Sequence, residues 1–348
     1  MVAEIIPSPF ILRFLKVFGL VPLRVKKFQM WLYSFMCLGI YFVCFGVFAL
    51  FMMIAGYDAL SIRGVVMFVG WPLAFLAIFS SVFKSVFKAE SKLLLIDTFQ
   101  EFDDILKAHF SITFDTNKYK GRLEKYFVSI ISVTVISIVY MAISISLKRL
   151  LFYICVMFLF MSILLESFHI FIHLKVIEER FKVLSNIKLS EIVQENSTSI
   201  KLLNLYKKLV LSMHEATKLT NAYFNPSLQF LLFFLYYMIL RSFLWIGLGF
   251  FKSQVLSIAQ SLIHILPNTI LIGLLGQVDH NTKQHIDKIK SNLICLKHPR
   301  NYNEDILLFL LKRKFSITLV GFSSISNITA ALCSFIVIVF QFLIIEEN

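Results

Sequence analysis

Seven long apolar runs divide this 348-residue chain and restrict the folds open to it. Each run is about as long as the roughly 20 apolar residues that a helix needs to cross the hydrocarbon core of a bilayer. The runs lie at 30–55, 64–83, 127–146, 150–174, 224–250, 257–277 and 321–345. Because backbone polar groups must be paired inside lipid, helices are the expected form of these runs. The sequence therefore predicts an all-α, polytopic membrane protein with seven transmembrane helices.

The basic residues are distributed unequally between the segments that join the runs. Segments 1–29, 84–126, 175–222 and 278–320 together hold 29 Lys and Arg, the segments on the opposite side hold 4, and Arg241 lies within the fifth run. Because cytoplasmic loops carry an excess of Lys and Arg, we expect the N-terminus inside and the C-terminus outside. The same rule explains the net charge of +13 without a nucleic-acid partner. The glycosylation sequon at Asn196 falls on the inner side and is expected to stay unmodified.

The inner segments carry narrow apolar stripes at helical spacing, whereas the outer loops are short. Such stripes favour helices that pack on other helices outside the membrane, and we expect a cytoplasmic anchor bundle made from inner extensions of the spans. The alternative is a set of amphipathic helices on the membrane surface. The stripes are Leu95, Phe99, Phe102 and Leu106; Leu202, Tyr206, Leu209, Met213 and Ala216; and Ile286, Ile289, Leu293 and Leu296.

The last run contains a nine-residue pattern, Ser334-Phe335, five hydrophobic residues, then Gln341-Phe342. It resembles the C-terminal signature of insect gustatory receptors, which reads Thr-Tyr, five hydrophobic residues and Gln-Phe. The segments "LKVFGLVP" from Leu15, "VIEERFKVLSNIKL" after the fourth run and "LYKKLVLSMHEATKLTNAYFNPSLQF" before the fifth are also similar to that family. One departure is the stretch from Gly321 to Phe335, which is shorter than in the family.

This resemblance implies a tetrameric, ligand-gated, non-selective cation channel of the plasma membrane, opened by a small-molecule tastant in the dendrites of gustatory neurons. Residues 1–29 would form a cytoplasmic N-terminal segment, 30–277 a six-helix ligand-binding bundle with cytoplasmic extensions, and 278–320 a cytoplasmic anchor segment. Residues 321–348 would form the pore-lining seventh helix and the external C-terminus. Assembly as a homo- or hetero-tetramer with other gustatory subunits is expected. The alternative within the same superfamily is an odorant-receptor-type channel or a co-receptor subunit.

The polar face of the last run is the candidate pore lining. Ser334, Ile338, Gln341 and Ile345 share one helix face at spacings of 4, 3 and 4. Rings of Ile can close a pore by dewetting, and a ring of amides can meet a partly hydrated cation. We therefore assign Ser334, Ile338, Gln341, Phe342 and Ile345 to the pore and gate. The alternative is that Gln341 hydrogen-bonds a neighbouring helix.

Aromatic and polar side chains gather in the outer halves of the other runs and suggest a ligand pocket. Arg241 is the strongest member, because a charge within a span should face a cavity or a partner. Trp71, Tyr153 and Trp245 have an alternative role as anchors at the membrane interface. Pro267 should kink the sixth run, which either couples the pocket to the pore or is purely structural. The pocket candidates are Trp71, Tyr140, Tyr153, Tyr237, Arg241, Trp245, Gln260 and His264.

The sequence disfavours two other classes of protein, a metal enzyme and a transporter. Glu166, His169 and His173 lie on one helix face, as in some metal enzymes, but the sequence offers no matching ligand set elsewhere. A transporter would show internal repeats and broken helices at matching positions, which are not apparent. We therefore expect neither an enzyme nor a resident cofactor, and we expect no ion pair between Glu166 and Arg241, whose depths differ by roughly 10 Å.

Overall fold

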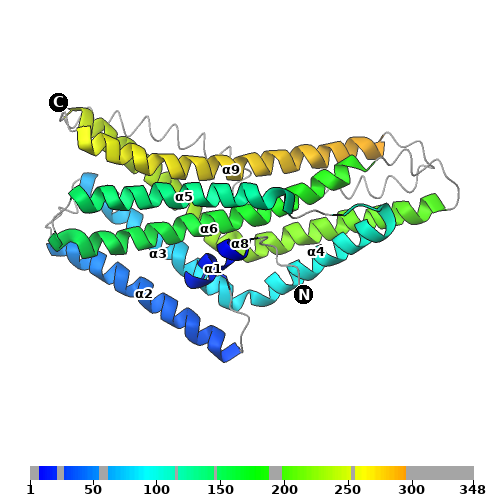
Figure 1. Ribbon diagram of the computed structural model, residues 1–348, viewed down its shortest axis with the longest axis horizontal. Coiled ribbons are helices and arrows are strands. Elements are labelled where there is room, and N and C mark those ends of the chain that lie inside the picture. The colour runs from blue at the N-terminus through cyan, green and yellow to red at the C-terminus, as the bar shows by residue number, and fades with distance from the viewer. Residues whose placement is uncertain are drawn as a thin grey trace.

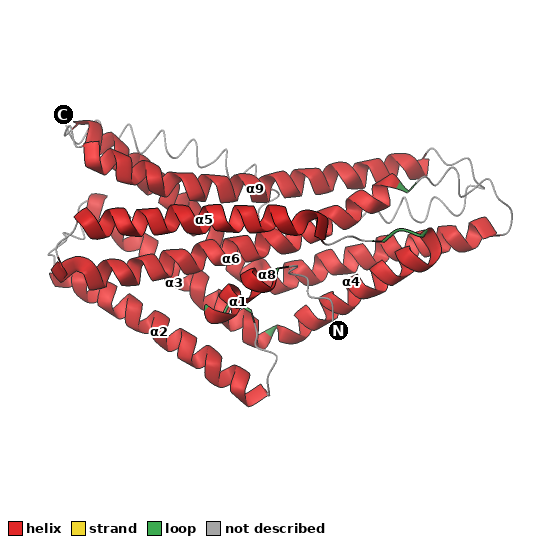
Figure 2. Cartoon of the chain, in the orientation of Figure 1, coloured by secondary structure: helices red, strands yellow, loops and turns green. Residues whose placement is uncertain are grey.

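The computed structural model describes residues 8–21, 27–54, 62–113, 117–144, 147–187, 198–251 and 255–294. These ranges contain eight helices and no strand (Figures 1 and 2). The helices are α1 (Pro9–Val17), α2 (Lys27–Ile54), α3 (Ile62–Phe87), α4 (Ala89–Phe110), α5 (Asn117–Ser144), α6 (Leu147–Asn186), α8 (Thr198–Phe251) and α9 (Val255–Ile294). The all-α prediction is confirmed for this part of the chain.

Six of the predicted spans fall on α2, α3, α5, α6, α8 and α9, and the seventh, 321–345, lies outside the described residues. Among the described helices, four are long and apolar enough to cross a membrane, at Trp31–Phe51, Gly70–Phe87, Ile154–Asn186 and Lys201–Gly247. The total of seven spans and the orientation of the chain therefore stay predictions.

The three longest helices extend far beyond the thickness of a bilayer. α6 and α9 have 40 residues each and α8 has 54. At a rise of 1.5 Å per residue these helices measure about 60 to 80 Å, against about 30 Å of hydrocarbon. We call the end where α5 meets α6 and α8 meets α9 the short-loop end (left in Figure 1), and the opposite end, beside α4, the α4 end.

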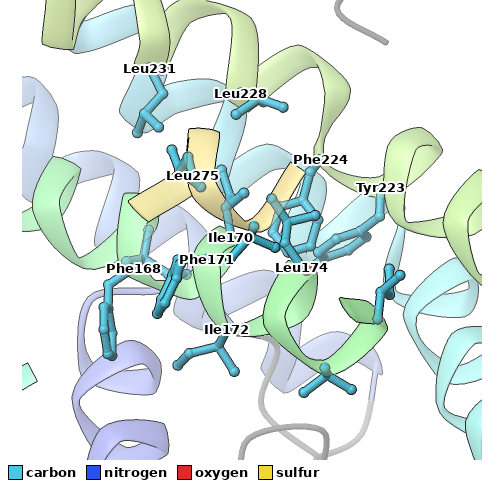
Figure 3. Packing of buried hydrophobic residues seen from close by; sticks show 14 of the residues in the cluster. Phe168, Ile170, Phe171, Ile172, Leu174, Tyr223, Phe224, Leu228, Leu231 and Leu275 are labelled. Carbon is cyan, nitrogen blue, oxygen red and sulfur yellow. The ribbon is translucent and has the colours of Figure 1, made fainter. Parts of the chain in front are cut away.

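α6 forms the centre of the bundle and contacts α2, α3, α5, α8 and α9. Its side chains are buried without a break from Ser162 to Leu174, so this part of the helix is enclosed by neighbours on all sides, including its polar residues Glu166, His169 and His173. Figure 3 shows Phe168, Phe171 and Leu174 of α6 packed near Phe224 of α8 and Leu275 of α9.

The narrow stripes of the predicted inner segments pack as helix-on-helix seams. Leu95, Phe99, Phe102 and Leu106 are all buried on α4, which lies against α8. Tyr206, Leu209, Met213 and Ala216 of the α8 stripe are equally buried, while Leu202 is half-buried. Ile286, Ile289 and Leu293 of α9 are buried as well, and Leu296 lies outside the described residues. Helix packing at the α4 end is thus confirmed, while its cytoplasmic position stays a prediction.

α1 is held against the bundle through the backbone of its C-terminal turn. The hydroxyl of Tyr41 donates to the carbonyl of Phe18 at 3.0 Å, that of Ser85 donates to the carbonyl of Gly19 at 3.1 Å, and that of Tyr33 donates to the carbonyl of Lys16. Gly19 has a φ of 71°, and a Cβ there would lie 2.9 Å from Cys37 Sγ. Glycine is required on both counts.

Candidate functional site

Every pocket residue predicted from the sequence lies on a helix segment at the short-loop end, and the structure describes the side chains of four of them. Trp71 comes from α3, and Tyr237, Arg241 and Trp245 come from α8. Tyr140 of α5, Tyr153 of α6, and Gln260 and His264 of α9 have described backbones, but their side chains lie outside the description. The pore candidates Ser334, Ile338, Gln341, Phe342 and Ile345 lie outside the described residues altogether.

Gly70 allows α3 and α8 to approach closely at this site. A methyl group on Gly70 would overlap with the ring of Tyr237, so only glycine leaves room for that ring. The next residue, Trp71, is buried and packs on Phe48 of α2 with ring centroids 3.8 Å apart. Three helices therefore meet around adjacent aromatic rings.

Polar groups at this meeting point are only partly satisfied. The indole Nε1 of Trp71 finds no hydrogen-bond partner among the described residues. Tyr237, Arg241 and Trp245 recur every four residues on one face of α8, and all three are half-buried. The side chain of Arg241 hydrogen-bonds that of Tyr237. A cation and an indole donor lined by aromatic rings suit a small molecule that carries a hydrogen-bond acceptor.

Deeper in the bundle, a buried ion pair joins α3 to α6. The ammonium group of Lys84 contacts Glu166 Oε1, donates to Ser227 Oγ at 3.0 Å and lies 4.0 Å from the centre of the Phe224 ring. Both charged side chains are 2% exposed. Glu166 therefore has a partner other than Arg241, as expected from their depths. The sequence reasoning missed Lys84 because it placed that residue in an inner loop.

The two histidines beside Glu166 belong to the same network. His169 Nδ1 lies 3.2 Å from Glu166 Oε2, and His173 Nδ1 lies 3.0 Å from the backbone oxygen of His169. Both rings pack edge-on against Phe224. Within the described part of the chain, no three His, Cys, Asp or Glu side chains are arranged to hold a metal ion. The Glu166–His169–His173 face is thus closely packed and hydrogen-bonded through the Nδ1 atoms, while the buried Nε2 atoms of both histidines have no partner among the described residues.

Pro226 lies inside the continuous helix α8, next to this ion pair. Because proline has no N–H, the carbonyl four residues earlier, at Ala222, loses its partner within the helix. Lys88, in the turn between α3 and α4, donates its ammonium group to that carbonyl. Its neighbour Lys84 donates to Ser227, the residue after the proline. Lys84, at the end of α3, and Lys88, just after it, therefore bind α8 on either side of Pro226.

At the α4 end a second ion pair ties α4 to α6. Arg180 donates to both carboxylate oxygens of Asp103, at 3.2 and 2.7 Å, and its guanidinium lies 4.3 Å from the centre of the Phe99 ring. Burial raises the pKa of the Asp103 carboxyl above its ordinary range, and Arg180 offsets part of that rise. The paired geometry is the bidentate one that favours arginine over lysine.

α6 and α9 are joined nearby by polar contacts. Asn281 donates to Glu178 at 3.1 Å, Asn292 donates to the carbonyl of Ser185 at 3.1 Å, and His285 Nδ1 lies 3.3 Å from Ser185 Oγ. A small polar cavity also lies between α6, α8 and α9. It is lined by Leu174, Ile177, Phe181, Thr217, Thr220, Asn221, Asp279 and Thr282.

Comparisons with known proteins identify the architecture. No protein-family profile matches the sequence, and no curated protein matches it significantly. The olfactory receptor OR5 of the insect Machilis hrabei superposes with a TM-score of 0.70 at 12% identity, over 96% of each chain. The chain has the fold of an insect olfactory receptor.

The OR5 likeness also holds for a ligand-bound form of that receptor. OR5 in complex with eugenol superposes with a TM-score of 0.64 at 11% identity, over 97% of this chain and 98% of that one. The agreement spans nearly the full length of both chains, which excludes a match limited to one helical hairpin. The two structures compared are of a chemoreceptor, and neither is of an enzyme.

Proposed function

We propose that this protein is a subunit of a tetrameric, ligand-gated, non-selective cation channel in the plasma membrane, of the gustatory type, and that a small tastant opens it. The observation that carries the proposal is the full-length likeness to OR5, including its complex with a small phenolic ligand. The Ser334-Phe335 to Gln341-Phe342 pattern resembles the gustatory signature and favours taste. The site of expression would be the dendrites of gustatory neurons.

The ligand would bind at the short-loop end among the eight pocket candidates. Support comes from Trp71 Nε1, which has no partner among the described residues, and from Tyr237, Arg241 and Trp245 on one half-buried face. The site has a cation and no described acid beside it, which suits a neutral or anionic ligand better than an amine. Ligand binding would open the pore at the seventh span, where Ile338 and Ile345 would form the gate and Gln341 would line the pore.

A tastant panel tests the function directly. Cells expressing the chain, alone and with candidate co-receptor subunits, are loaded with a calcium indicator and exposed to sugars, bitter compounds and volatile phenols. Ligand-evoked calcium entry supports a channel, and single-channel steps separate a channel from a carrier. No response to any compound in any subunit combination that reaches the cell surface would contradict the proposal.

Two variants locate the response once a ligand is found. Arg241→Gln should weaken ligand potency, whereas Lys218→Gln, at a side chain that is 68% exposed on α8, should not. Gln341→Ala should change conductance or ion selectivity without changing potency. If Gln341→Ala leaves conductance, selectivity and gating as they were, the amide does not face the pore.

An odorant-type channel is the second candidate, because OR5, with which this chain was compared, is an olfactory receptor. The compound panel distinguishes a gustatory from an odorant-type channel. If volatile phenols open the channel and soluble tastants do not, the odorant type is favoured. The predicted orientation is tested separately by tags at both ends. On unpermeabilised cells the C-terminal tag should be accessible, and an accessible N-terminal tag would contradict the topology.

A further inference from the structure

The short helix α1 exposes large apolar side chains next to a charged one. α1 buries Ile11, Leu12 and Leu15 against the bundle. Its other face exposes Phe10 and Val17, whose side chains are 52% and 71% accessible. Between these two lies Arg13, which is also exposed. The outer face of α1 therefore presents two large apolar side chains on either side of a cation.

The spacing places these three side chains on a single stripe. Phe10, Arg13 and Val17 are three and four residues apart, so they project in nearly the same direction. A helix with an apolar face and cationic side chains is typical of the boundary between lipid headgroups and acyl chains. In that setting Phe10 and Val17 enter the acyl layer, and Arg13 extends its charged end to the headgroups.

Hydrogen bonds and ring contacts hold α1 on the bundle, so the stripe of Phe10, Arg13 and Val17 has a defined direction relative to the other helices. The carbonyls of Lys16, Phe18 and Gly19 accept hydrogen bonds from side chains of α2 and α3. Phe10 and Phe14 also pack edge-on against Phe127 of α5, with centroids 5.7 and 5.6 Å away. α1 also contacts α6, so it is docked on α2, α3, α5 and α6, and any ligand on its outer face is connected to them.

The charge around α1 is predominantly positive. No Asp or Glu occurs between Glu4 and Asp58, whereas this stretch holds Arg13, Lys16, Arg24, Lys26 and Lys27. On α5, Arg122 and Lys125 are exposed within five residues of Phe127, the contact of α1, and the half-buried Glu124 between them is the one acid of this segment. Basic segments beside a membrane attract anionic lipids with about 1 kcal/mol per Lys or Arg.

We infer that α1 is a binding site for anionic phospholipids of the inner leaflet, with Arg13 and Lys16 contacting the headgroup and Phe10 and Val17 contacting the acyl chains. The leaflet follows from the proposed topology, in which the N-terminus is cytoplasmic. A second copy of the chain fits less well, because the four exposed residues of a nine-residue helix offer far less than the roughly 800 Å² per partner of a stable interface.

A lipid titration tests this site on the full-length protein. The chain is purified in a neutral detergent, and its thermal unfolding midpoint is followed while short-chain phosphatidylserine, phosphatidylcholine of the same chain length, or inorganic phosphate is added. Phosphatidylserine should raise the midpoint saturably, and the other two should leave it unchanged. An equal effect of phosphatidylcholine, or of inorganic phosphate, would overturn the proposal.

Matched charge variants locate the effect. Replacing Arg13 and Lys16 together by Gln should weaken the apparent affinity for phosphatidylserine roughly 30-fold, from two contributions of about 1 kcal/mol each. Replacing Lys182 and Lys218 by Gln removes the same charge from side chains that are 51% and 68% exposed, and should leave the affinity unchanged. Equal losses in both pairs would overturn the site at α1.

A third variant covers the case in which the double charge variant does not fold. Phe10→Ser keeps the charge of α1, and it should weaken phosphatidylserine binding while binding of inorganic phosphate stays absent. Full phosphatidylserine affinity in Phe10→Ser would exclude acyl contact at α1. These measurements need no ion conduction, so a failed lipid site and a failed channel give different results.

Discussion

The middle of this bundle and its short-loop end surround their cations differently. Lys84 contacts a carboxylate, a hydroxyl and an aromatic ring, and is 2% exposed. At the short-loop end, Trp71 Nε1 has no partner among the described residues, and Arg241 contacts Tyr237 while staying half-buried. Removing one partner of the first cation would leave the other charge buried and unpaired, whereas the second cation is half-buried and belongs to the proposed ligand site.

The surroundings of a cation, unlike its presence in the sequence, help to distinguish a structural role from a role in ligand binding. Both regions contain a cation within an apolar helix, and either would be taken as a functional hypothesis in a membrane protein. The surroundings distinguish them, because Lys84 is enclosed by a carboxylate, a hydroxyl and an aromatic ring, whereas Arg241 is half-buried and belongs to the proposed ligand site. Replacing residues in each region should therefore change different measurements.

The largest effect is expected for the buried ion pair. Glu166→Ala leaves Lys84 charged and unpaired, which should lower the free energy of unfolding by about 3–5 kcal/mol. Replacing Lys84 by Met and Glu166 by Leu together should recover most of that loss. Chemical unfolding in detergent measures both. Glu179→Gln is the control, because it removes only the partly exposed pairs with Lys175 at 3.2 Å and Lys182 at 3.9 Å, and it should change stability by less than about 1 kcal/mol.

Gly70→Ala should come next, and it should affect both ligand response and stability. The added methyl group must displace the Tyr237 ring, which lowers the free energy of unfolding by about 1–3 kcal/mol and moves the partner of Arg241. Dose–response curves and thermal unfolding measure the two effects. Gly46→Ala on α2 meets no atom within 4 Å and should be neutral or slightly stabilising. If Gly70→Ala behaves in the same way, the close approach of α3 to α8 is not required.

Trp71→Phe should change the ligand response while leaving stability within about 1 kcal/mol. The smaller ring keeps the contact with Phe48 and removes the only hydrogen-bond donor of the side chain. Potency should fall for ligands that carry an acceptor at that position, as measured by calcium entry. Trp31→Phe is the matched control, because that ring packs on Phe87 with centroids 4.8 Å apart, far along α3 from Gly70. Unchanged potency in Trp71→Phe would place the indole outside the pocket.

The smallest effect is a pH dependence at the α4 end. Burial lowers the pKa of His285 below its ordinary value of 6.5, so the unfolded chain binds its proton more readily than the folded one. Stability from this group is present above pH 6.5 and is lost as the pH falls toward the folded pKa. His285→Gln should flatten the unfolding midpoint between pH 7 and about 5 relative to the wild type. The charged groups around it are Glu178, Glu179, Lys182 and Lys288.

Local pattern was sufficient to predict the helices and their packing faces. The stripe Leu95, Phe99, Phe102 and Leu106 follows helical spacing, and all four side chains are buried. The closeness of Tyr237 and Arg241 is also local, since residues four apart on a helix are neighbours. Such features depend on a few consecutive residues, which a single sequence contains.

Long-range contacts could not be predicted in the same way. Glu166 and Lys84 are 82 residues apart, and their pairing depends on how α3 packs against α6. Lys84 lies in a run with Ser81 and Ser85 at helical spacing, which hinted at a buried polar face. The role of Gly70 could not be read at all, because glycine becomes necessary only once another helix brings a ring against it.

Pro226 gives α8 a mechanical property that its length alone would not. The helix is continuous over 54 residues, yet at the proline one internal hydrogen bond is replaced by a bond from Lys88 to the carbonyl of Ala222. The backbone hydrogen bonding of α8 at that point therefore depends on a side chain from the α3–α4 turn. A displacement of that turn away from α8 would remove this bond and leave the helix with one bond fewer at the proline.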